Sequence, residues 1–138
     1  MERRHRIRNI ARALLIPVAT YIGLYSVDLT TNFTSHRIKT QQELVEIIKE
    51  EANKLDLNRE VVGKLENKNL AHSLLTNDTI FLIMGGSGAN SKYVRHELYH
   101  WYREGFDDPR LGTFEGELKY WFVEEPSAII YSLTGLKI

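Results

Sequence analysis

Apolar and charged side chains alternate with a helical period across residues 40–55. Apolar residues recur at intervals of three, four or seven, at Leu44, Ile47, Ile48 and Leu55. Charged residues fill the other face, at Glu43, Glu46, Lys49, Glu50, Glu51 and Lys54. Thr40, followed three residues later by Glu43, is typical of a capping box, in which two side chains satisfy backbone N–H groups at a helix start. We therefore predict an amphipathic helix here, with its charged face toward solvent.

Shorter apolar runs between polar turns predict strands after this helix. Residues 61–65 and 70–75 are predicted to be two short strands, separated by a turn at Asn67-Lys68-Asn69. Residues 79–84 are apolar and rich in side chains that favour strands, which predicts a strand buried on at least one face. The glycine-rich residues 85–91 lack the Lys-Ser/Thr of a phosphate-binding loop, so we interpret them as a connector.

Helical periodicity returns in residues 93–102. Apolar side chains lie at i, i+4 and i+7, at Val94, Leu98 and Trp101. This face is expected to pack on a core. Asn90 or Ser91 is expected to cap the helix, which should end near Gly105.

A last helical segment is predicted for residues 120–133, stopping at Thr134-Gly135. Together the elements predict an α+β fold: an amphipathic helix, a short antiparallel or mixed sheet, a second helix and a C-terminal helix. The chain has 138 residues, the size of one domain with a single core. We assign this domain to residues 36–138.

Residues 1–35 differ in composition from the rest of the chain. Basic side chains gather in the first twelve residues, at Arg3, Arg4, His5, Arg6, Arg8 and Arg12. An uncharged apolar run of fifteen residues, 13–27, follows; it contains Pro17 and Gly23 and is shorter than the roughly 20 residues that span a bilayer. Three roles agree with this pattern: a membrane anchor or membrane-lying segment, a helix or strand packed on the domain, or a pro-segment over an active-site cleft.

The overall charge is balanced, with 18 Lys and Arg against 18 Asp and Glu. This balance gives no reason to expect a nucleic acid as partner. The chain contains no cysteine, which excludes disulfides and cysteine-ligated metals. Histidine and carboxylate side chains are then the only strong zinc ligands available.

The predicted helix 93–102 contains a His-Glu-x-x-His sequence, with His96, Glu97 and His100. Residues four apart on a helix project side by side, about 5–6 Å apart at Cβ, so the two histidines can bind one zinc ion. Glu97 lies about 100° around the helix from His96, near enough to accept a proton from a zinc-activated water without being a ligand. This spacing predicts a catalytic zinc site.

A catalytic zinc site normally has a third protein ligand. We favour Glu125, because on a continuous helix it would lie in an apolar stripe, where a carboxylate needs a metal as partner, whereas Glu124 is freer to face water. Proline is tolerated in the first turn of a helix, so the helix can instead begin at Pro126. Glu125 would then lie at the helix cap and outside the stripe, and Glu124 is a candidate ligand as well. Asp107 or Asp108 is a further alternative.

The His-Glu-x-x-His helix with uncharged flanks, followed by Glu125-Pro126-Ser127-Ala128, resembles the gluzincin metallopeptidases. The small size and the order of the elements are most similar to the archaeal minigluzincins, over roughly residues 40–135. The resemblance implies a zincin-like domain that hydrolyses peptides or proteins. Some members of the family are zymogens, which agrees with the pro-segment interpretation.

By this resemblance His96, His100 and Glu125 would bind Zn²⁺, and Glu97 would be the general base. The strand at residues 80–84 would be the sheet edge along which an extended peptide lies. The zinc ion would polarise the scissile carbonyl and lower the pKa of its water, while Glu97 would pass the proton to the leaving amine.

The sequence leaves several points open. Either Tyr120 or Tyr131 could stabilise the oxyanion of a peptidase. A catalytically inactive or latent zincin-like module, plugged by its own N-terminal segment, is the alternative to a peptidase. A membrane-associated scaffold with incidental histidines is a second alternative, with membrane contact through the N-terminal segment.

Overall fold

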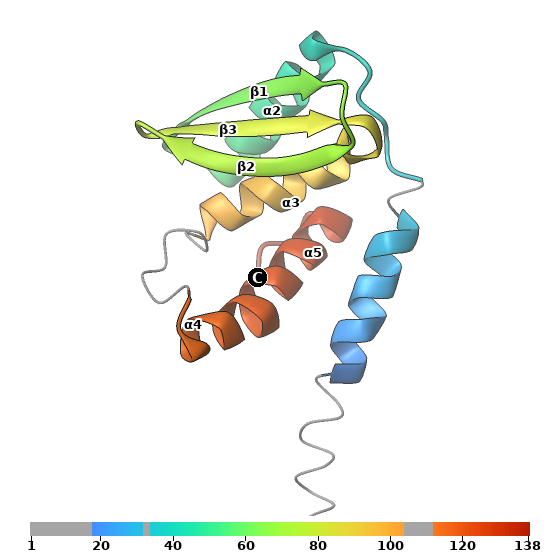
Figure 1. The fold of residues 1–138 in the computed structure, drawn as a ribbon, viewed down its shortest axis with the longest axis vertical. Helices are drawn as coiled ribbons and strands as arrows, with labels where there is room; N and C mark the ends of the chain where they lie inside the picture. Colours follow the sequence, from blue (N-terminus) through green and yellow to red (C-terminus); the bar gives the residue numbers. More distant parts are fainter. Residues whose placement is uncertain (1–17, 32–33, 104–111) are drawn as a thin grey trace, which may run out of the picture.

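The computed structural model describes residues 18–31, 34–103 and 112–138 (Figure 1). A three-stranded mixed sheet lies on one side, with α2 and α3 packed beneath it and the C-terminal helices beyond α3 (Figure 1). From residue 41 on, the main helices and strands are α2 (Gln41–Leu55), β1 (Glu60–Glu66), β2 (Leu70–Thr76), β3 (Thr79–Gly85), α3 (Ser91–Tyr102), α4 (Phe114–Lys119) and α5 (Glu125–Thr134). The predicted α+β class with a mixed sheet is confirmed.

Helix α2 forms where its period predicted it. The Thr40 side chain accepts a hydrogen bond from the Glu43 N–H at 3.2 Å, while the Glu43 carboxylate accepts one from the Lys39 N–H at 2.7 Å. The expectation that the whole charged face meets solvent is wrong at Glu51, which is 3% exposed. Glu51 is buried because Arg95 of α3 pairs with its carboxylate at 3.0 Å.

The strand order is β1-β3-β2, with β1 parallel and β2 antiparallel to β3. The expectation that residues 80–84 form a sheet edge is therefore wrong, because β3 is paired on both sides and β1 and β2 are the edges. The physical reason is the tight β2–β3 turn, in which Asn77 and Asp78 both have positive φ, 49° and 63°. This two-residue turn is typical of a hairpin and sets β2 directly beside β3.

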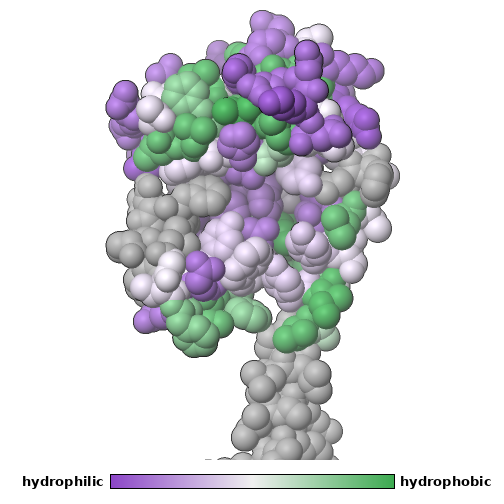
Figure 2. Space-filling model, viewed as in Figure 1, coloured by the Kyte–Doolittle hydropathy of each residue, from purple (hydrophilic) through white to green (hydrophobic). Residues whose placement is uncertain are grey.

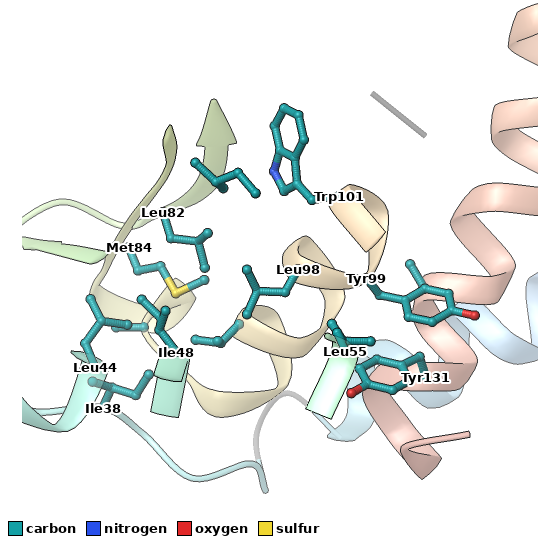
Figure 3. Close-up of a cluster of buried hydrophobic side chains, with 14 residues drawn as sticks. Ile38, Leu44, Ile48, Leu55, Leu82, Met84, Leu98, Tyr99, Trp101 and Tyr131 are labelled. Atoms are coloured by element: carbon teal, nitrogen blue, oxygen red, sulfur yellow. The ribbon is translucent and has the colours of Figure 1, made fainter. Parts of the chain in front are cut away.

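The core lies between the sheet and the helices α2 and α3 (Figure 3). Leu82 and Met84 of β3 and Leu98 of α3 are 0% exposed, as the period of each element predicts. Helix α2 approaches β1 closely at Gly63, where a Cβ atom would lie 2.4 Å from the Ile48 side chain. Glycine at this position therefore lets the helix pack directly on the strand.

The C-terminal region is a longer helix than the sequence predicted. It begins with α4, continues through a π-helical turn at Tyr120–Glu124, and runs on as α5 to the left-handed cap Gly135. The Glu125 N–H bonds to the Tyr120 carbonyl, five residues earlier. The wider turn lets the helix continue through Pro126, which lacks an N–H and would clash with a carbonyl in a regular α-helix.

Residues 18–31 form a helix beside the C-terminal helices (Figure 1). Its Asp28 is 8% exposed and pairs with Lys92 of α3, with 2.6 Å between Oδ1 and Nζ. The arginine-rich residues 1–12 lie outside the described residues, and the role of residues 1–35 stays a prediction. Among the described helices, none is both long and apolar enough to cross a membrane.

Candidate metal centre

Helix α3 carries both histidines, and its start is firmly capped. The Asn90 side chain accepts a hydrogen bond from the Tyr93 N–H at 3.0 Å and donates one to the Ser87 carbonyl at 3.1 Å. Asn90 is fully buried, so the cap also joins the glycine-rich connector to the helix. Of the two predicted caps, Asn90 is the one observed. The helix ends at Tyr102, close to the predicted end near Gly105, a residue that itself lies outside the described ones.

His96, His100 and Glu125 bring three ligand atoms together. The distance from His96 Nε2 to His100 Nε2 is 3.2 Å, and His100 Nε2 lies 3.1 Å from Glu125 Oε2. The third side, from His96 Nε2 to Glu125 Oε1, is 3.5 Å. His100 is 1% exposed at its side chain and the other two are 13% exposed, so the cluster is largely shielded from water.

These distances fit a single metal ion. Zinc binds nitrogen and oxygen at about 2.0–2.2 Å with tetrahedral geometry, which places neighbouring ligand atoms about 3.3–3.6 Å apart. Two imidazoles and one carboxylate also form a donor set of catalytic zinc sites. The same set can bind other divalent first-row metals, so the geometry supports a metal site without selecting the metal.

Charge and hydrogen bonding couple the three side chains. Burial lowers the pKa of His96, but the hydrogen bond and the charge of Glu125 outweigh it, and the net shift is upward. Burial raises the pKa of Glu125, but its hydrogen bonds to His100 and His96 hold it well below its usual range. Both shifts favour the charged forms of His96 and Glu125, and a metal ion that binds these side chains competes with the proton on the imidazole.

Glu97 lies beside this cluster and is held by the sheet. Its carboxylate accepts a hydrogen bond from the Ser73 hydroxyl at 2.6 Å. Ser73 belongs to the edge strand β2, so the strand fixes the orientation of the predicted general base. Sequence reasoning missed Ser73, because only the strand order shows that β2 passes over α3.

Of the two tyrosines proposed for the oxyanion, only Tyr120 is at the cluster. Its ring stacks on His100, with 5.5 Å between centroids. Burial and the charges of Glu125 and Glu97 raise the pKa of Tyr120, so its hydroxyl stays protonated. The Tyr131 hydroxyl instead donates to Glu51 at 3.3 Å, away from the cluster.

Glu124 points away from the histidines. It is 3% exposed and pairs with Arg103 at 3.3 Å and with Lys119 at 3.4 Å. The expectation that Glu124 faces water is therefore wrong. The apolar stripe predicted around Glu125 is buried only after it, where Ala128 and Ile129 are 0% and 1% exposed, and not before it, where Trp121 and Phe122 are 48% and 50% exposed.

The π-turn explains this difference, because it interrupts the regular period on which the stripe was based. The two aspartates that were alternative ligands, Asp107 and Asp108, lie outside the described residues.

Comparison of the chain with protein-family models, curated proteins and solved structures found no match. The resemblance to gluzincins therefore stays a prediction. The function has to be argued from the arrangement of the described side chains.

Proposed function

We propose that this protein is a zinc-dependent peptidase. The observation that carries the proposal is the convergence of His96, His100 and Glu125 on one point, beside a carboxylate that is not part of the triangle. A metal site with three protein ligands leaves a position for substrate or water, as catalytic zinc sites do and structural ones do not. Glu97, held by Ser73, supplies the base that such a site needs.

A zinc ion at this position would supply Lewis acidity toward a peptide carbonyl and lower the pKa of a water. Glu97 takes the proton of the attacking water on its carboxylate and delivers it to the nitrogen of the leaving amine. The Ser73 hydroxyl keeps one oxygen of Glu97 fixed during this transfer. The Tyr120 hydroxyl, which is hydrogen-bonded to Glu125, would redirect its hydrogen bond to the developing oxyanion.

The sheet supports an extended peptide as substrate. Within the described residues, β2 pairs with β3 on one side only, so its other edge has free N–H and C=O groups. A peptide that adds to this edge would run past Ser73 and Glu97. The proposed substrate edge is thus β2, in place of residues 80–84.

A latent form is the second candidate, because the helical segment 18–31 lies close to the cluster. The charge of Asp28 contributes to the raised pKa of His96. Burial and the charge of Glu125 raise the pKa of Tyr21. In the latent candidate this helix limits access to the metal centre, and hydrolysis requires that it be displaced.

The proposal is tested by zinc content and hydrolysis measured on the same preparations. Wild type should bind about one zinc per chain and cleave a denatured protein. Glu97→Gln should retain the zinc and lose about 10²–10⁴-fold in activity, because a general base contributes about that factor. Glu46→Gln, an exposed glutamate on α2, is the matched control and should change neither quantity.

Two further variants complete the test. Glu125→Ala should lose the zinc. Glu124→Gln should keep the zinc, because Glu124 pairs with Arg103 and Lys119. Full activity in Glu97→Gln would rule out the assigned base. A wild type that binds no zinc after reconstitution would end the peptidase proposal. Zinc without cleavage would support the latent candidate, and removal of residues 1–31 should then restore hydrolysis.

A further inference from the structure

Large apolar side chains are exposed at the end of the molecule opposite the sheet. The aromatic face, as we name it, consists of Tyr21, Phe114, Leu118, Trp121 and Phe122. Phe114 is 81% exposed, and Leu118, Trp121 and Phe122 are 43–50% exposed. Figure 2 shows two hydrophobic areas here, one over α4 and one over the start of the helix 18–31.

The aromatic face is assembled from two distant parts of the sequence. The rings of Tyr21 and Phe122 lie 6.3 Å apart, and the five side chains line a hollow of about 290 Å³. Among the described residues that line it, the only charged one is Glu117. Glu117 accepts a hydrogen bond from Trp121 Nε1 at 3.3 Å. Because this N–H has a partner within the protein, the indole ring can enter an apolar environment without an unsatisfied donor.

The sequence that leads into this face is strongly basic. Residues 1–12 contain five arginines and one glutamate, and residues 13–17 then lead to Val18, the first described residue of the helix. Val18 and Ile22 on that helix are 44% and 59% exposed. Arginine-rich sequence beside exposed Trp, Phe and Leu is typical of segments that lie on membranes.

We propose that the aromatic face docks this protein on an anionic lipid surface, with the arginine-rich sequence of residues 1–12 as the reason to expect anionic headgroups. The aromatic side chains enter the boundary between headgroups and acyl chains, and the arginines bind the anionic headgroups. The docking does not depend on the metal centre or on the proposed peptidase activity.

Vesicle co-sedimentation of the full chain tests the proposal. Wild type should bind vesicles of equal parts phosphatidylcholine and phosphatidylserine, and should bind phosphatidylcholine alone at least tenfold more weakly. Binding should weaken as salt is raised. Tryptophan fluorescence should shift to shorter wavelength on binding, because Trp121 moves from water into lipid. The other tryptophan, Trp101, is 6% exposed and already buried, so the shift reports on Trp121.

Two sets of variants separate the two contributions. Trp121→Ser with Phe122→Ser should weaken binding at least tenfold, and changing Arg3, Arg4 and Arg6 to Gln should remove the preference for phosphatidylserine. Leu74→Thr, at a 38% exposed leucine on the sheet, is the matched control and should bind as wild type. Circular dichroism should show that every variant is folded.

Several outcomes would overturn the proposal. The proposal is overturned if wild type fails to bind phosphatidylserine vesicles. It is also overturned if both sets of variants bind these vesicles as tightly as wild type. A dimer that the Trp121 and Phe122 changes dissociate, without any vesicle binding, would instead assign the aromatic face to a second copy.

Discussion

The sheet half of the molecule, from α2 to α3, contains a cluster of buried apolar side chains, whereas the helix 18–31 leaves most of its large apolar side chains in solvent. Leu44, Leu82 and Leu98 of the sheet half are 0% exposed. Among the described residues, the buried apolar cluster receives no side chain from the helix 18–31. That helix is fixed instead by the Asp28–Lys92 ion pair and the contact of Tyr21 with Phe122.

The difference separates two kinds of apolar sequence in this chain. In the sheet half, burial of apolar side chains removes them from water and drives folding. In the helix 18–31, apolar side chains stay exposed after folding, which agrees with the proposed docking on a lipid surface. A helix held by few contacts should also open locally at a lower free energy than the core unfolds.

The largest effect is expected from Leu98→Ala. Removing this fully buried side chain should lower the free energy of unfolding by about 3 kcal/mol, through lost burial and the cavity left behind. Leu118→Ala is the matched control at a 43% exposed leucine of α4, and should change stability by less than about 1 kcal/mol. Urea denaturation measures both, and equal losses would contradict the division into two regions.

A smaller and local effect is expected from Asp28→Asn. The substitution removes the Asp28 carboxylate, so the buried Lys92 loses its ion pair. The free energy of local opening of the helix 18–31 should fall by about 2 kcal/mol. Amide hydrogen exchange should rise in this helix and stay unchanged in β3. Asp78→Asn, at a side chain 80% exposed, is the control. Faster exchange across the whole chain would show that the helix unfolds together with the sheet.

The smallest effect is expected from Phe114→Ser, because this side chain is 81% exposed. The free energy of unfolding, measured by thermal denaturation, should change by no more than about 0.5 kcal/mol. A loss as large as that expected for Leu98→Ala would mean that Phe114 belongs to a core, and the distinction between the two regions would fail.

Much of the sheet half could be predicted from the sequence, because each element has a clear period. The strand order could not, since it depends on contacts between residues that are distant in the sequence. Asn77 and Asp78 were the local signal that β2 and β3 form a hairpin. The parallel pairing of β1 with β3 has no such local signal.

Part of the metal centre could likewise be predicted from the sequence, and part of it could not. His96 and His100 could be paired from their spacing, because both lie on one regular helix. The surroundings of Glu124 and Glu125 could not be derived from a regular period, because the π-turn includes Glu124 and ends directly before Glu125. Ser73 and Tyr120 depend on the strand order and on the same turn, so the sequence pattern could not place them.

The π-turn at Tyr120–Glu124 has a consequence for how this sequence can change in length. One residue more or fewer between Thr113 and Glu124 would turn the following helix by about 100°. Glu125 would leave the histidines, and Glu124 would leave Arg103 and Lys119. Substitutions at the exposed positions of this turn keep both carboxylates in place, whereas a single insertion or deletion displaces them together. In this stretch the number of residues is therefore as much a determinant of the metal centre as their identity.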